Sequence, residues 1–117
     1  METVMGLLSD DIVWTNIGST DFSGTFRGKA ALMENLLGPV FSRLKAGIKN
    51  TIELMVAEGD YVIVQDSGVA ETVDGQAYNN TYCHIFQIQQ DKIVAVTEYF
   101  DTALAQNVLG SVVVGGS

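Results

Sequence analysis

The sequence predicts one α+β domain in which a curved antiparallel sheet wraps around helices. Apolar residues recur every three or four positions between Lys29 and Leu44, which is typical of an amphipathic helix. The segments after it are rich in β-branched and aromatic residues and are separated by short polar breaks, as in consecutive strands. Because 117 residues are too few for two cores, we expect a single domain over 1–110 and a tail over 111–117.

The composition limits the classes of function. Six Lys and Arg against 14 Asp and Glu give a net charge of -8, which repels nucleic acid and anionic membrane surfaces. No stretch approaches the roughly 20 apolar residues of a membrane span, and no secretory signal is visible, so we expect a cytoplasmic protein. One cysteine and one histidine predict no internal disulfide and no transition-metal site.

The first elements are a short helical turn at Val4 to Leu8 and a strand that alternates from Ile12 to Ile17. Residues 18–28 are rich in Gly, Ser, Thr and Asp and are interpreted as a connecting loop. The following amphipathic helix is interrupted by Gly38-Pro39. Proline removes a backbone donor and disfavours helical geometry before it, so we expect the helix to kink there or to split into two.

Four strands are then expected to form an antiparallel meander. The first two span 50–57 and 61–73, and the hairpin signal Asp74-Gly75 follows them. The last two flank the polar break Gln90-Asp91-Lys92 and reach Phe100. A short helix then follows, with Asp101 or Thr102 as its cap and Gly110 at its end.

Alternation places the only histidine on an unusual strand face. That face carries Tyr78, Asn80, Tyr82, His84 and Phe86. An amide, phenols and an imidazole among aromatic rings are typical of the lining of a small-molecule pocket. If Glu98 on the next strand lies on the same face, its carboxylate comes within reach of His84.

The order LLSDDIVWTN, FRGKAAL, DGQAYNNTY and DKIVAVTEYFDT resembles the SnoaL-like branch of the nuclear transport factor and ketosteroid isomerase superfamily. The resemblance covers about Met5 to Leu109. It implies a cystatin-like cone with a cavity between sheet and helices, and a homodimer formed through the outer face of the sheet. Members usually open with a long helix over the cone mouth, and we expect that helix to be absent here.

The catalytic aspartate of ketosteroid isomerases falls at Asn16 in this comparison, and an amide cannot accept a proton as a base does. That activity is therefore not expected. SnoaL-type polyketide cyclases use an acidic residue near the end of the last strand as acid and base, which leaves Glu98 or Asp101. Aromatic neighbours would shield Glu98 from water and suit it to proton transfer. His84 would share or relay that proton, as titration near neutrality allows.

Limonene-epoxide hydrolases place an aromatic residue and an asparagine on the first strand, and Trp14 and Asn16 resemble that pair. The Asp-Arg-Asp triad of those enzymes would fall at Gln65, Ser67 and Glu98. A slip of one residue in the strand register would bring Asp66 in place of Ser67. Of the positions Gln65, Ser67 and Glu98, only Glu98 carries a carboxylate. Epoxide hydration is therefore a more specific variant of the acid–base chemistry that the resemblance implies.

These comparisons predict a catalytic set of Glu98, His84 and Asp101. The residues expected to bind substrate are Trp14, Asn16, Gln65, Ser67, Asn80, Tyr82 and Phe100. The favoured function is a cofactor-free isomerase, cyclase, lyase or hydrolase acting on a small apolar carbonyl or oxygenated compound. Structural roles remain open for His84 as a satisfied donor and for Asp101 as a helix cap. The alternative function is a non-catalytic dimeric module for ligand binding or association.

Overall fold

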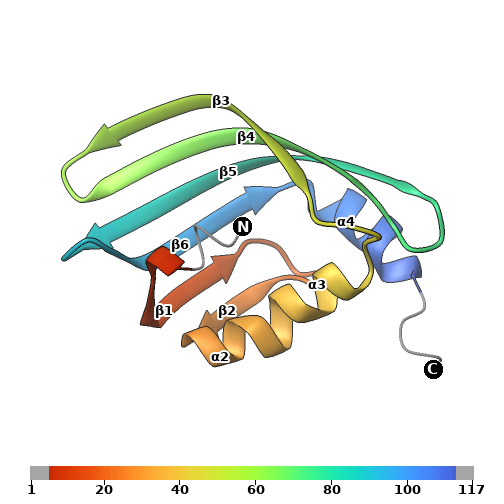
Figure 1. Cartoon of the computed structure of the whole chain (residues 1–117), viewed down its shortest axis with the longest axis horizontal. Coiled ribbons are helices and arrows are strands. Elements are labelled where there is room, and N and C mark those ends of the chain that lie inside the picture. Colours follow the sequence, from red (N-terminus) through yellow and green to blue (C-terminus); the bar gives the residue numbers. More distant parts are fainter. Residues whose placement is uncertain (1–5, 113–117) are drawn as a thin grey trace.

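The computed structural model describes residues 6–112, in which six strands form one curved sheet (Figure 1). Their order across the sheet is β2-β1-β6-β5-β4-β3. The strands are β1 (Leu8–Asn16), β2 (Gly24–Arg27), β3 (Lys49–Glu58), β4 (Tyr61–Glu71), β5 (Ala77–Gln89) and β6 (Lys92–Phe100). The helices α2 (Lys29–Leu32) and α3 (Gly38–Ser42) lie on the concave side, and α4 (Thr102–Val108) lies at one end of the sheet. This architecture confirms the predicted α+β cone.

Strands β3 to β6 form the expected antiparallel meander. The β5–β6 connection turns at Gln90 and Asp91, whose φ angles of 52° and 65° match those of two-residue hairpin turns. The sheet is nevertheless mixed, because β1 pairs with β6 in parallel. Alternation of side chains is the same in parallel and antiparallel strands, so the sequence pattern does not signal this direction.

Two short elements differ from the prediction. β1 begins at Leu8 instead of Ile12; Gly6 and Leu7, within the expected helical turn, are helical, and Val4 lies outside the described residues. Residues 24–27 of the expected loop form β2, which pairs with β1. A strand of four residues is too short for its alternation to be recognised beside Gly and Ser. Most of the tail expected at 111–117 also lies outside the described residues.

The interruption expected at Gly38-Pro39 takes the form of a π-helical turn, Met33–Leu37, between α2 and α3. The Gly38 N–H donates to the carbonyl oxygen of Met33, five residues earlier. A Cβ on Gly38 would lie 2.7 Å from that oxygen, so a side chain there would clash with the wide turn. The turn precedes the proline and keeps Leu36 and Leu37 buried against the sheet.

The core lies between the concave face of the sheet and the helices. Its most buried side chains come from β1, α2, β6 and the segment after α4, and they include Leu8, Ile12, Leu32, Val96 and Leu109. Within residues 6–112, no long helix precedes β1. None of the helices in this range has the length and apolar character needed to cross a membrane.

The cap of α4 provides a test of the fold. The Asp101 carboxylate accepts a hydrogen bond of 3.0 Å from the Leu104 N–H. We expect Asp101→Ala to lower the free energy of unfolding by about 1 kcal/mol, because the substitution removes the helix cap. Urea unfolding measures this change. Asp10→Ala is the matched control, since it removes the same charge at an exposed strand position; an equal loss in both variants would contradict the capping role.

Candidate functional site

A cavity of about 500 Å³ lies on the concave face of the sheet. Side chains from β1, β3, β4, β5 and β6 form one wall, and side chains from the helical segments form the other. Most of the lining is apolar. Its polar side chains are Asn16, Asn50, Asp66, Tyr78, Tyr82, His84 and Glu98. Such a lining, with a few polar groups at defined positions, is typical of a small-molecule site.

The pairing of β5 with β6 places His84 opposite Glu98. The His84 Nε2 lies 2.6 Å from the Glu98 Oε2, and the two side chains are only 14% and 15% exposed. This pairing depends on an irregularity in β6 at Val94, where the register shifts by one residue. Without the shift, the pairing set by the turn would place Thr97 opposite His84 and would turn Glu98 to the outer face.

A second carboxylate contacts the other ring nitrogen of His84. Asp66 on β4 places its Oδ1 3.2 Å from Nδ1, and its side chain is 6% exposed. Asn50 on β3 donates a hydrogen bond of 2.7 Å to the second Asp66 oxygen. The sequence comparison placed Asp66 in the site only if the strand register slipped by one residue, and it did not predict Asn50. The signal that identifies Asp66 is its place between Val64 and Gly68 on the buried face of β4.

The two carboxylates favour the protonated ring of His84. A neutral imidazole donates from one nitrogen only, whereas an imidazolium donates to both carboxylates. Burial acts to lower the His84 pKa, but the hydrogen bonds and charges of Glu98 and Asp66 outweigh burial and raise the pKa above its ordinary value. The site therefore holds a proton between two acidic side chains.

Aromatic rings hold the imidazole from both faces. Tyr82 and Phe86 precede and follow His84 on the same face of β5, with ring centroids 5.7 Å and 5.5 Å from its centroid and nearly parallel planes. Trp14 approaches edge-on at 6.2 Å. Both faces of the His84 ring are thus covered, and its nitrogen-bearing edge is directed to the carboxylates. Burial raises the pKa of the Tyr82 phenol, which keeps that group neutral.

Trp14 and Asn16 line the same cavity from β1. The Trp14 indole N–H donates to the Asn16 side-chain oxygen at 2.7 Å, and the Asn16 amide donates to the Phe22 carbonyl oxygen at 2.8 Å. In the parallel pairing of β1 with β6, Asn16 is the partner of Glu98. Phe100 also lines the cavity. The structure therefore brings these expected residues together with His84 and Glu98.

Gln65 and Ser67 do not belong to this group, which corrects the position derived from the epoxide hydrolases. They pair with Cys83 and Thr81, so they lie on the outer face of the sheet. The Ser67 hydroxyl donates to Glu53 there, at 2.8 Å. A displacement of one residue along a strand turns a side chain to the opposite face, which is why Asp66 takes the inner position.

Asn80 and Asp101 have structural contacts and do not line the cavity. Asn80 is buried, and its amide donates to the Tyr78 hydroxyl at 3.0 Å and to the Asp101 carbonyl oxygen at 3.1 Å. The Asp101 carboxylate caps α4. The structure therefore shows Asp101 in the helix-cap role that the sequence left open. Within residues 6–112, no group of three or more His, Cys, Asp or Glu side chains is arranged to hold a metal ion.

Comparison with known proteins identifies relatives at two levels. The family model described as "SnoaL-like domain" matches residues 1–96 of the chain. No significant match was found among curated proteins.

Solved structures share the fold at low sequence identity. An NTF2-like protein of unknown function from Burkholderia pseudomallei K96243 superposes with a TM-score of 0.80 at 17% identity, over 94% of this chain and 85% of that chain. A protein described as a candidate isomerase from Bacillus subtilis gives 0.76 at 16% identity, over 97% and 84%. A protein described as a candidate SnoaL-like polyketide cyclase from Jannaschia sp. CCS1 gives 0.74 at 13%, over 94% and 78%.

The carboxylates around His84 predict how it titrates. We expect its NMR titration midpoint to lie above about 6.5, and we expect Glu98→Gln to lower it by removing the partner of Nε2. The chain has one histidine, so a tag-free protein gives an unambiguous signal. Because the folded pKa is raised, protonation stabilises the fold below the unfolded pKa, and this contribution is lost as pH rises through the folded pKa. A midpoint below the ordinary value would show that burial prevails.

Proposed function

Because this chain belongs to the SnoaL-like domain family, we propose that its cavity is the active site of a cofactor-free enzyme that moves a proton on a small apolar carbonyl or oxygenated compound. Isomerisation, cyclisation, elimination and hydrolysis are the reactions of this type. The contact between His84 and Glu98 on the wall of an apolar cavity is the observation that carries the proposal. Low exposure strengthens a proton donor or acceptor there, because few water molecules compete for it.

Glu98 is the proposed acid and base. Its Oε2 contacts His84, and none of the described residues donates a hydrogen bond to its Oε1. In the proposed reaction, a proton leaves a substrate carbon next to a carbonyl group, binds Oε1, and returns to another atom of the substrate. This reaction needs no oxidant and no second reactant. In a hydrolysis, the same oxygen takes its proton from the attacking water.

His84 is the proposed partner of Glu98, and Asp66 and Asn50 position it. The imidazole exchanges a proton with Glu98 across the 2.6 Å contact. Asp66 orients the ring through Nδ1, and Asn50 in turn orients Asp66. Trp14, Asn16, Tyr82 and Phe100 are the proposed substrate contacts. Asn80 supports this wall through its bonds to neighbouring groups.

The similar structures described as a candidate isomerase and a candidate polyketide cyclase support this class of reaction. Isomerases and cyclases rearrange the atoms of one substrate. Such reactions proceed by moving protons and electron pairs, which an acid–base pair in an apolar cavity can perform alone. The fold by itself does not select the reaction, so the proposal depends on the residues of this cavity.

A non-catalytic ligand-binding or association module is the second candidate. One observation favours it: within residues 6–112, every buried side-chain nitrogen and oxygen atom has a hydrogen-bond partner. The fully buried polar atoms are therefore satisfied without a ligand, as they would be in a structural core.

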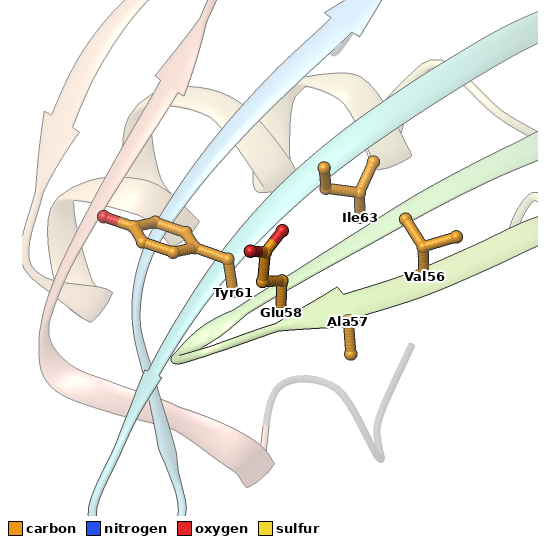
Figure 2. A pocket seen from close by; sticks show the side chains of 5 residues that line it. All are labelled: Val56, Ala57, Glu58, Tyr61 and Ile63. Atoms are coloured by element: carbon orange, nitrogen blue, oxygen red, sulfur yellow. The ribbon is translucent and has the colours of Figure 1, made fainter.

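We propose a homodimer formed through the outer face of the sheet. That face exposes large apolar side chains, which are Leu54, Val56, Tyr61, Ile63, Val69 and Tyr99. Figure 2 shows Val56, Glu58, Tyr61 and Ile63 pointing to one side of the β3–β4 hairpin and Ala57 to the other, and these five residues line a pocket. Contiguous exposed apolar side chains of this kind mark protein interaction sites.

We also propose that the protein acts in the cytoplasm. Its one cysteine, Cys83, is free and half-buried, which suits a reducing compartment.

The acid–base role is tested with Glu98→Gln. We expect turnover to fall by roughly 100-fold to 10,000-fold, because the amide cannot accept the proton. The assay uses a panel of enolisable ketones and epoxides, with product measured by chromatography. Glu53→Gln is the matched control, since Glu53 is an exposed carboxylate on the outer face and should be silent. Unchanged turnover in Glu98→Gln would remove Glu98 as acid and base; absence of turnover across the panel in the wild-type protein would favour the binding module.

The dimer is tested with the double variant Val56→Glu, Ile63→Glu. Charges on the outer face should convert the dimer to a monomer, because each would be desolvated in the interface. Sedimentation velocity measures the outcome. Met33→Glu is the control, since Met33 is an exposed apolar side chain on the helical side of the molecule. A wild-type monomer, or a dimer that survives both outer-face charges, would contradict this interface.

A further inference from the structure

The cavity lacks a lysine or arginine side chain. The six basic residues of the chain all fall within the described range, and they are Arg27, Lys29, Arg43, Lys45, Lys49 and Lys92. None of them lines the cavity. Arg43 approaches its wall, but the guanidinium lies over the Phe22 ring and donates to the carbonyl oxygens of Pro39 and Leu109. It is therefore committed to the backbone and is not available to a bound anion.

The charged groups that do line the cavity are Asp66, Glu98 and His84. Two carboxylates and one imidazolium leave one net negative charge, which is surrounded mainly by apolar side chains. Burial raises the pKa values of both Tyr78 and Tyr82, so the phenols stay neutral and do not change this balance. An anion entering this space loses its hydration and meets a like charge at low dielectric.

The hydrogen-bonding groups of the cavity also favour a ligand that donates a hydrogen bond over one that accepts it. The Trp14 N–H is bound to Asn16, and both nitrogens of His84 are bound to carboxylates. Glu98 Oε1 is a carboxylate oxygen in the cavity wall to which none of the described residues donates a hydrogen bond. A ligand that donates an O–H group to this oxygen completes the site.

The stacked rings of β5 favour a flat ligand. Tyr82 and Phe86 cover both faces of the His84 ring, so His84 presents its edge to the cavity. Ring edges carry the positive end of the aromatic quadrupole and attract the negative face of another ring.

We propose that the cavity selects neutral, flat molecules that donate a phenolic or enolic O–H to Oε1 of Glu98, and that it excludes carboxylate anions. The inference rests on the proposed function in so far as the cavity is taken as the substrate site. It goes further by naming the charge, the donor group and the protein atom that receives it.

The test is calorimetric binding of naphthol, methoxynaphthalene and naphthoate, all substituted at the same ring position, to the whole chain at neutral pH. Naphthol is expected to bind most tightly. Methoxynaphthalene has no donor and should bind about tenfold more weakly, as expected for loss of a hydrogen bond to a charged group. Naphthoate should bind at least about tenfold more weakly than naphthol because of its charge.

Two variants separate charge from hydrogen bonding. Asp66→Asn removes one negative charge, so it should improve naphthoate binding. Glu98→Gln replaces the acceptor carboxylate, so it should improve naphthoate binding and also reduce the preference for naphthol over methoxynaphthalene. Glu53→Gln, on the outer face, should change neither. Thermal unfolding of each variant verifies that it is folded.

Naphthoate bound as tightly as naphthol by the wild-type protein would overturn the inference, and so would failure of all three ligands to bind. These outcomes are distinct from failure of the proposed function. If the three ligands bind in the expected order of affinity but no substrate is turned over, the proposed selectivity is supported and the proposed enzymatic function is contradicted. If turnover depends on Glu98 but naphthoate binds tightly, the proposed enzymatic function is supported and the proposed selectivity is contradicted.

Discussion

The register between β5 and β6 is the constraint on which the candidate site depends. The tight turn at Gln90 and Asp91 starts the pairing, and the irregularity at Val94 shifts it by one residue before it reaches His84. This shift turns Glu98 inward, opposite His84. Because side chains alternate along a strand, one residue decides whether the carboxylate faces the cavity or the outer surface. A local feature of one strand thus determines the chemistry of the concave face.

Asp66, His84 and Glu98 stabilise one another's charged forms inside the protein. Each buried carboxylate alone would be costly to remove from water, and the imidazole alone would lose its proton on burial. Together, Asp66 and Glu98 raise the His84 pKa, and His84 donates to both. Asn50 satisfies the remaining oxygen of Asp66. A buried group of this kind is weak evidence for stability, because apolar residues could fill the same space, and it therefore favours a functional role.

The two faces of the sheet carry different kinds of side chain. The concave face carries the cavity, and glycine at position 68 helps to shape it, because a Cβ there would lie 2.9 Å from Tyr82. The convex face exposes apolar side chains of β3 and β4 and the carboxylate of Glu53. Glu53 and Glu98 are carboxylates on opposite faces, and comparing them isolates the effect of the cavity.

The sequence by itself determined the α+β class, the four-stranded meander and the shared face of Tyr82, His84 and Phe86, because these follow from periodicity within single segments. It also indicated Glu98 as the partner of His84, conditionally. The tertiary structure alone decided the parallel pairing of β1 with β6, the short strand β2, the inward position of Asp66 and the contribution of Asn50. Those features depend on register and on pairing between distant segments. A shift of one residue reverses a side chain without changing the pattern within the strand, so no reading of a single segment determines it.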